Sequence, residues 1–206
     1  MRVSKLIKHF SLLTIMAVSL GAASAQAPNS GHTKLAAASA ARPELALDFT
    51  YLRSNAPPGG CTCFNLYGGS ATFAYPINKG PFALVGDITA AQNGSISSNG
   101  FGLTLSTYTV GARYEPKLHI LLLHPFGQAL VGVAHSSGSL VQGAGTSVSN
   151  ASAAFAANVG GGVDLATSRR IWVRAIQAEY LPTTFDNGSN NHQNNLRISA
   201  GIVIRF

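Results

Sequence analysis

Short runs in which apolar and polar residues alternate recur along the second part of the chain, and the most regular of them covers residues 195–206. Successive side chains of a β-strand point to opposite faces, so strict alternation predicts a strand with one apolar face. The apolar face of this run consists of Leu196, Ile198, Ala200, Ile202, Ile204 and Phe206. The opposite face carries Arg197, Ser199, Gly201 and Arg205, with Asn195 at its start and one apolar residue, Val203.

Seven further runs of this kind precede the last one. They cover residues 44–53, 64–75, 82–91, 101–114, 121–135, 153–166 and 171–181. None of them contains the roughly 18 consecutive apolar residues that indicate a transmembrane helix. Strands of about 9–11 residues can instead cross a bilayer when they close into a barrel, and eight is a permitted number of strands. The sequence therefore predicts an all-β fold, a closed eight-stranded antiparallel transmembrane β-barrel over residues 44–206.

The connections between these runs alternate in length. Long connections follow the odd-numbered runs, at residues 54–63, 92–100, 136–152 and 182–194, and short ones follow the even-numbered runs, at residues 76–81, 115–120 and 167–170. Outer-membrane barrels have long outer loops and short periplasmic turns, which is the same alternation. Closure is also required physically, because unpaired strand edges cannot be left in lipid.

The beginning of the chain has the three parts of a secretory signal peptide. A basic start, an apolar stretch at residues 10–21 and the small residues Ala23-Ser24-Ala25 predict cleavage after residue 25. Residues 26–43, rich in Ala, Ser and Pro, are expected to form a flexible periplasmic segment. Three of the 14 Lys and Arg leave with the signal and all seven Asp and Glu stay, so the formal net charge falls from +7 to +4. The basic composition is therefore partly a targeting feature, and we expect no nucleic-acid partner.

The last eight residues, SAGIVIRF, resemble the C-terminal assembly signal of bacterial outer-membrane barrels, with Gly201, Ile204 and Phe206 at its glycine, hydrophobic and aromatic positions. Residues 44–206 resemble the small eight-stranded outer-membrane barrels built like the transmembrane domain of outer-membrane protein A. The runs that carry this resemblance are ALDFTYLRSNAPPGGC, LVGDI, GARY, PFGQALVG, GGGVDL, WVRAIQAEYLPT and NNLRISAGIVIRF. The resemblance implies a bacterial outer membrane, with lipid around the barrel and the barrel-assembly machinery and periplasmic chaperones as partners during biogenesis.

Charged residues within the predicted strands are expected to point into the barrel. The interior of an eight-stranded barrel is just wide enough for its own side chains, and an arginine on the lipid face would cost about 2–4 kcal/mol at the bilayer midplane. The interior candidates are Asp48, Asp87, Arg113, Asp164, Glu179 and Arg197, with Arg174 and Gln177 as further ones. A plug of ion pairs is the favoured interpretation, and a gated polar path is the alternative. Arg174 and Glu179 are an odd number of positions apart, so both can face inward only if a β-bulge separates them.

Two local motifs have structural interpretations. Gly160-Gly161-Gly162 lacks the Lys and Ser or Thr of a phosphate-binding loop and is expected to permit a bend or to make room for a large neighbour. Cys61 and Cys63 lie in the first long connection, where the oxidising conditions that an exported protein meets favour a disulfide although the ring would be tight. Two thiols without a role, or redox or metal chemistry, remain the alternatives.

His135 and Ser137 have the spacing of the His and Ser of deacylases that act on lipid A. No Asp or Glu follows them before Asp164, which the topology places toward the other side of the membrane, so an orienting acid is missing. We predict no catalytic, cofactor-binding or metal-binding residues. The long connections contain a single charged residue, Asp186, which argues against electrostatic capture of a ligand and fits hydrogen-bonded contact with glycans or proteins.

The predicted function is accordingly that of a non-catalytic outer-membrane barrel with an envelope structural or surface-interaction role, whose surface ligand the sequence does not identify. A narrow pore for small solutes is the first alternative, and a hydrolase that modifies lipid A is the second.

Overall fold

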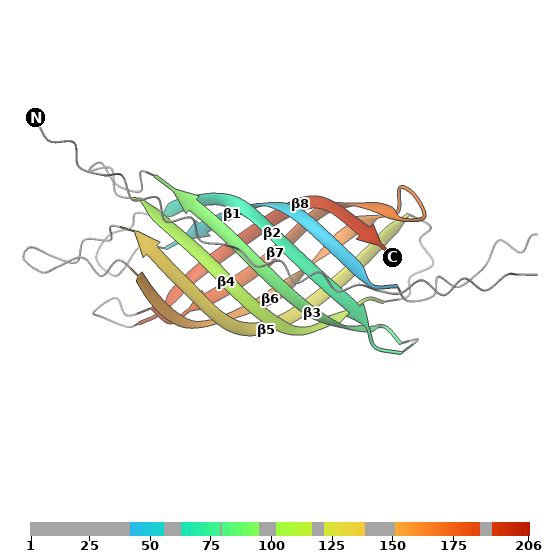
Figure 1. Cartoon of the computed structure of the whole chain (residues 1–206), viewed down its shortest axis with the longest axis horizontal. Coiled ribbons are helices and arrows are strands. Elements are labelled where there is room, and N and C mark those ends of the chain that lie inside the picture. Colours follow the sequence, from blue (N-terminus) through green and yellow to red (C-terminus); the bar gives the residue numbers. More distant parts are fainter. Residues whose placement is uncertain are drawn as a thin grey trace, which may run out of the picture. The chain divides into compact units, whose positions relative to one another are not determined.

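The structure is a computed structural model that describes residues 42–55, 63–78, 80–94, 102–116, 122–138, 151–185 and 191–206. Its strands are β1 (Glu44–Ser54), β2 (Phe64–Pro76), β3 (Phe82–Asn93), β4 (Leu103–Tyr114), β5 (Leu123–Gly138), β6 (Ala151–Leu165), β7 (Ile171–Thr183) and β8 (Gln193–Arg205). They form a closed barrel in sequence order, and Figure 1 shows them wound obliquely around one axis. No helix within these ranges is both long and apolar enough to cross a membrane.

The barrel closes by pairing of its first and last strands. Glu44 lies opposite Arg205 and Ser54 opposite Asn195, and every neighbouring pair of strands is antiparallel. The C-terminus therefore lies at the end of the barrel where β1 begins (Figure 1). The predicted fold, a closed eight-stranded antiparallel barrel, is confirmed.

The outer face of the barrel wall is apolar and the inner face is polar, as a lipid environment requires. Large apolar side chains such as Phe49, Phe73, Ile88, Val131 and Ile202 point outward and are about half exposed or more, whereas the charged residues of the strands face inward, apart from Arg53 near the loop end of β1. This distribution is the reverse of that in a water-soluble barrel, because the surrounding solvent is expected to be hydrocarbon.

Aromatic pairs mark both ends of the outward apolar surface. Phe82 and Tyr114 contact each other near the short turns, with ring centroids 5.2 Å apart. Tyr51 and Tyr67 do so near the long connections, with ring centroids 5.5 Å apart. Aromatic girdles at the two interfaces are typical of transmembrane barrels.

The predicted β-bulge is present in β7. Arg174 pairs with Gly201 and Gln177 with Ser199, so the register of β7 against β8 shifts between Arg174 and Gln177. The extra residue changes the parity of the strand and brings Arg174 and Glu179 to the same inner face. This prediction is confirmed.

Six of the eight strands extend one to three residues further toward the long connections than predicted. β5 continues to Gly138 and β7 to Thr183, past the residues 135 and 181 at which the apolar alternation ends. Strand pairing persists there because it needs only a partner backbone, whereas alternation is required only where one face meets lipid. The predicted signal peptide at residues 1–25 and all of the segment 26–43 except residues 42 and 43 lie outside the described residues, so both stay predictions.

Candidate functional site

The barrel interior holds a dense set of charged side chains. Nine charged residues are buried there, five acids and four arginines. They are Glu44, Asp48, Asp87, Asp164, Glu179, Arg113, Arg174, Arg197 and Arg205. All six sequence-predicted interior residues are in this set, and the two further candidates, Arg174 and Gln177, are buried as well. Because buried charges are costly unless they are paired, the contacts among them decide what the interior can do.

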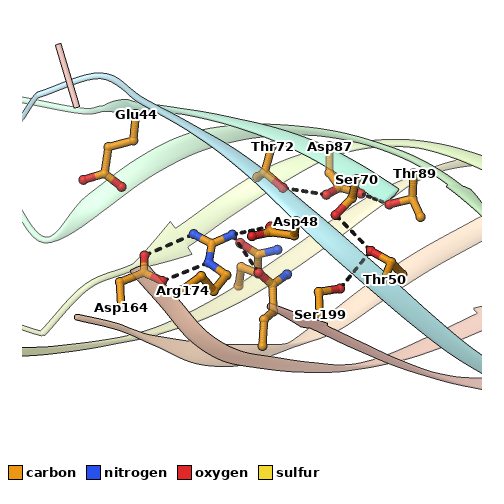
Figure 2. A network of polar contacts seen from close by, with 12 residues as sticks. Glu44, Asp48, Thr50, Ser70, Thr72, Asp87, Thr89, Asp164, Arg174 and Ser199 are labelled. Atoms are coloured by element: carbon orange, nitrogen blue, oxygen red, sulfur yellow. Dashed lines mark hydrogen bonds and ion pairs between the residues drawn. The ribbon is translucent and has the colours of Figure 1, made fainter. Parts of the chain in front are cut away.

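The middle of the interior is organised around Arg174 on β7. Its Nε and Nη2 donate to the two carboxylate oxygens of Asp164, at 2.9 and 3.1 Å. Its Nη1 donates to Asp48 at 3.1 Å and to the side-chain oxygen of Gln177 at 2.8 Å. Figure 2 shows Arg174 between Asp164 and Asp48, so one guanidinium joins the first, sixth and seventh strands across the lumen.

A second centre, Arg197 on β8, lies nearer the long connections. Its Nε donates to Glu179 on β7 at 2.6 Å and its Nη1 to Asp87 on β3 at 2.7 Å, with a further contact to Thr89. Asp87 also accepts hydrogen bonds from Thr72 at 2.8 Å and Thr89 at 3.0 Å (Figure 2). Arg197 thus links the closing strand β8 to β3 across the lumen.

The third centre lies at the turn end and is built on Glu44. Its carboxylate pairs with Arg205 on β8 at 2.7 Å and with Arg113 on β4 at 3.7 Å. The Nε of Arg113 donates to Gln128 at 3.0 Å, and Gln128 in turn donates to Glu179 at 2.8 Å. A chain of polar contacts therefore runs from the turn end of the barrel to the Arg197 centre.

Phe126 on β5 fills the space between two of these arginines. The guanidinium carbons of Arg113 and Arg174 lie 4.3 and 4.7 Å from its ring centroid, within the range of cation–π contact. Gly162 on β6 leaves the room for this ring, because a Cβ there would lie 2.8 Å from it and 2.5 Å from the carbonyl oxygen of Ile176. This glycine of the Gly160–Gly162 run accommodates a large neighbour, which confirms that part of the prediction.

An apolar layer covers the polar interior at the end of the long connections. It consists of Leu52, Leu66, Ala91, Leu103, Leu105, Ala134, Ala156 and Leu181, with Phe64 and Phe185 packed against it. Leu52, Leu66 and Leu181 are at most 1% exposed. The chain of ion pairs ends at this layer, and beside it Asn195 on β8 contacts Ser54 on β1 and donates to Thr183 on β7 at 3.2 Å, so a small buried polar group shares the loop end of the interior with the apolar residues.

Sequence reasoning did not select this layer or several polar members of the network. Leu52 follows Asp48 by an even number of positions on β1 and so shares its inward face, which was the available signal. Glu44 and Arg205 likewise lie on the polar faces of their strands, and Gln128 lies on the inner face of β5. The alternation thus indicated these positions, but it could not show which of them meet.

The residues of the terminal signal occupy three different environments. Gly201 lies on the inner face of β8 opposite Asp48, Ile204 is half-buried on the outer face, and Phe206 is exposed, with its amide donating to the carbonyl of Pro43 at 3.1 Å. Cys63 is exposed just before β2. Its predicted partner Cys61 lies outside the described residues, so the disulfide stays a prediction.

His135 and Ser137 project from the outer face of β5 near its loop end. Their neighbours across the β4–β5 pairing are Ser106 and Thr104. Six of the seven acids are described, of which five are buried inside the barrel and the sixth, Glu115, lies just after β4 at the opposite end. No carboxylate within the described ranges is therefore placed to orient His135. Over the same ranges, no group of three or more His, Cys, Asp or Glu side chains is arranged to hold a metal ion.

Comparisons with known proteins give a structural match only. No family model matches the chain, and no curated protein matches it significantly. Among solved structures, it is similar to Neisserial surface protein A, with 18% identity and a TM-score of 0.60 over 80% of this chain and 97% of that one. It is also similar to the attachment invasion locus protein Ail of Yersinia pestis, with 16% identity and a TM-score of 0.53 over 80% of this chain and 99% of that one. A second Ail structure, a complex with the heparin analogue sucrose octasulfate, matches over the same shares with 15% identity and a TM-score of 0.52.

Proposed function

We propose that this chain, which has the fold of the small eight-stranded outer-membrane barrels, is a non-catalytic outer-membrane protein that serves envelope structure or surface contact. The observation that carries the proposal is the filled interior. Paired arginines and carboxylates occupy its middle, and an apolar layer covers them at the loop end. A lumen filled in this way supports a closed plug over a solute path.

Planar bilayers test the plug against a narrow pore. We expect the purified protein to give no stable current steps in a planar lipid bilayer, because ions would have to cross both the ion-pair network and the layer around Leu52, Leu66 and Leu181. A large porin added to the same bilayer is the positive control. Reproducible current steps that scale with the amount of protein would replace the plug with the pore.

The state of the protein in that experiment is checked by gel electrophoresis. A closed barrel that resists detergent migrates differently before and after boiling, because only boiling unfolds it. Membrane-extracted protein with no such heat-modifiable mobility would contradict the proposed barrel itself, independently of any result on conductance.

The surface role that we infer is directed at uncharged partners. One Ail structure was solved with a polysulfated heparin analogue, a ligand that needs basic side chains. The four long connections of this chain contain no Lys or Arg, and Asp186 is their one charge. We therefore expect contact through hydrogen bonds with glycans or proteins instead of capture of anions.

Replacement of Ser137 tests the hydrolase alternative. We expect Ser137→Ala to leave the lipid A profile of producing cells unchanged, because no described carboxylate is placed to orient His135 and so activate Ser137. Mass spectrometry of lipid A from cells that produce the wild type, the variant or neither protein measures this. Loss of a deacylated lipid A species in the Ser137→Ala cells, with equal amounts of folded barrel, would establish an enzyme.

A further inference from the structure

A hollow of about 650 Å³ lies at the loop end of the barrel, over β2 to β5. Four of its lining side chains form a single row across the four strands. Tyr67 pairs with Gln92, Gln92 with Thr104, and Thr104 with Ser137. Gly94 and Gly102 at the adjoining strand ends also line the hollow.

These four side chains point away from the lumen. Their neighbours along the strands, such as Leu66, Ala91 and Leu105, are buried in the apolar layer inside, and alternation places Tyr67, Gln92, Thr104 and Ser137 on the other face. Tyr67 is 48% exposed. The row is therefore accessible from outside the barrel wall.

The row lies at the border of the apolar outer surface. Four residues further along each strand toward the turn end, the next but one outward-facing row consists of Ala71, Ile88, Tyr108 and Val133. Those are lipid-facing residues of the kind found in the hydrocarbon belt of a barrel. A molecule that contacts the Tyr67–Ser137 row therefore lies at the depth of the lipid head groups.

The chemistry of the row is uncharged hydrogen bonding next to an aromatic ring. β2 to β5 contain two charged residues in all, Asp87 and Arg113, and both are buried inside the barrel. An amide and two hydroxyl groups can each donate and accept hydrogen bonds, which suits the vicinal hydroxyl groups of a sugar. A tyrosine ring offers a flat apolar face with a polar tip for the C–H side of the same sugar. A phosphate or sulfate group would find no outward cation on β2 to β5 themselves, and the outward Arg53 of β1 lies at the edge of the row, opposite Asn65.

We propose that the row of Tyr67, Gln92, Thr104 and Ser137 binds the neutral sugar head group of a glycolipid in the surrounding leaflet. The inference rests on the proposed outer-membrane placement, since only that placement surrounds the row with lipid head groups. The head group of the glycolipid contacts the outer side of the barrel wall, and its acyl chains lie along the apolar surface on the turn-end side of the row.

Lipid retention measured by native mass spectrometry tests the proposal. The full barrel is placed in bilayers that contain phosphatidylcholine and a digalactosyl diacylglycerol of the same chain length, and the lipids that stay bound on release are counted. We expect the digalactosyl lipid to be retained about tenfold over phosphatidylcholine, as for one or two net hydrogen bonds. Equal retention of the two lipids would overturn the inference.

Matched variants locate the site. Tyr67→Ala, and separately the double variant Gln92→Leu with Thr104→Val, are expected to abolish the preference for the sugar lipid. The control is Tyr75→Ala, because Tyr75 is another outward tyrosine of β2, 57% exposed, at the turn end. An equal loss in Tyr75→Ala, or a preference retained in both row variants, would contradict the assignment.

Two independent outcomes separate this inference from the proposed function. Heat-modifiable mobility of every variant shows whether the barrel is intact, and silent bilayers show whether its lumen is closed. If both hold for the wild type and sugar lipids are not preferred, the glycolipid site is wrong and the proposed function stands.

Discussion

Replacing Arg197 with methionine is expected to destabilise the barrel by about 3–5 kcal/mol, the usual cost of removing one partner from a buried ion pair. Arg197 is 1% exposed and contacts Glu179 on β7 and Asp87 on β3. Without the guanidinium, two buried carboxylates would lie close together in the lumen without a counter-charge. The free energy of unfolding, measured by denaturant titration of the heat-modifiable form in detergent, should fall accordingly.

Two further variants show whether the loss comes from the unpaired acids. Arg169→Met is the control, because Arg169 is exposed in the turn between β6 and β7 and its removal should change stability little. The triple variant Arg197→Met, Asp87→Asn, Glu179→Gln removes the charges together and should recover most of the stability. If Arg197→Met is as stable as the wild type, or the triple variant is no better than the single one, the ion-pair network does not hold the barrel together.

The fold could be predicted because alternation encodes which face of each strand meets lipid. A residue such as Phe49 can be tolerated outward, and one such as Asp48 inward, only in a closed barrel. The alternating lengths of the connections then predicted which ends of the strands carry the long loops and which carry the short turns. Even the bulge in β7 was predictable, since Arg174 and Glu179 cannot both avoid lipid without a shift in parity.

The contacts inside the barrel could not be predicted in the same way. Parity places Arg197 inward, but its partners Asp87 and Glu179 are separated from it by 110 and 18 positions. Which inward residues share a level depends on the stagger between strands, which hydrophobic patterning does not determine. The same limit applies to the apolar layer, where Leu52 and Leu181 come from strands far apart in sequence.

A glycine at position 201 can be explained by recognition of the C-terminal assembly signal or by the close approach of the neighbouring strand, and the sequence alone does not distinguish the two explanations. The sequence assigned it to the C-terminal assembly signal. In the barrel it lies opposite Asp48 at the closing seam, where a Cβ would lie 2.1 Å from the carbonyl oxygen of Leu47 and 2.5 Å from Oδ1 of Asp48. Contacts under 3.0 Å to backbone atoms cannot be relieved by a side-chain rotation, so β1 and β8 would have to separate.

Gly201→Val is therefore expected to prevent or strongly weaken closure even when no cellular factor is present. Overpacking of this kind costs about 3 kcal/mol or more when backbone must move. Refolding of urea-denatured protein into detergent micelles, followed by the fraction with heat-modifiable mobility, measures closure in the absence of any assembly machinery.

Gly86→Val provides the matched control for this experiment. Gly86 also lies within a strand, but it faces outward, and a Cβ there would meet no atom within 4 Å. We expect Gly86→Val to refold like the wild type. If Gly201→Val also refolds fully in micelles and fails only in cells, then Gly201 acts through recognition of the terminal signal and the close approach of β1 does not require it.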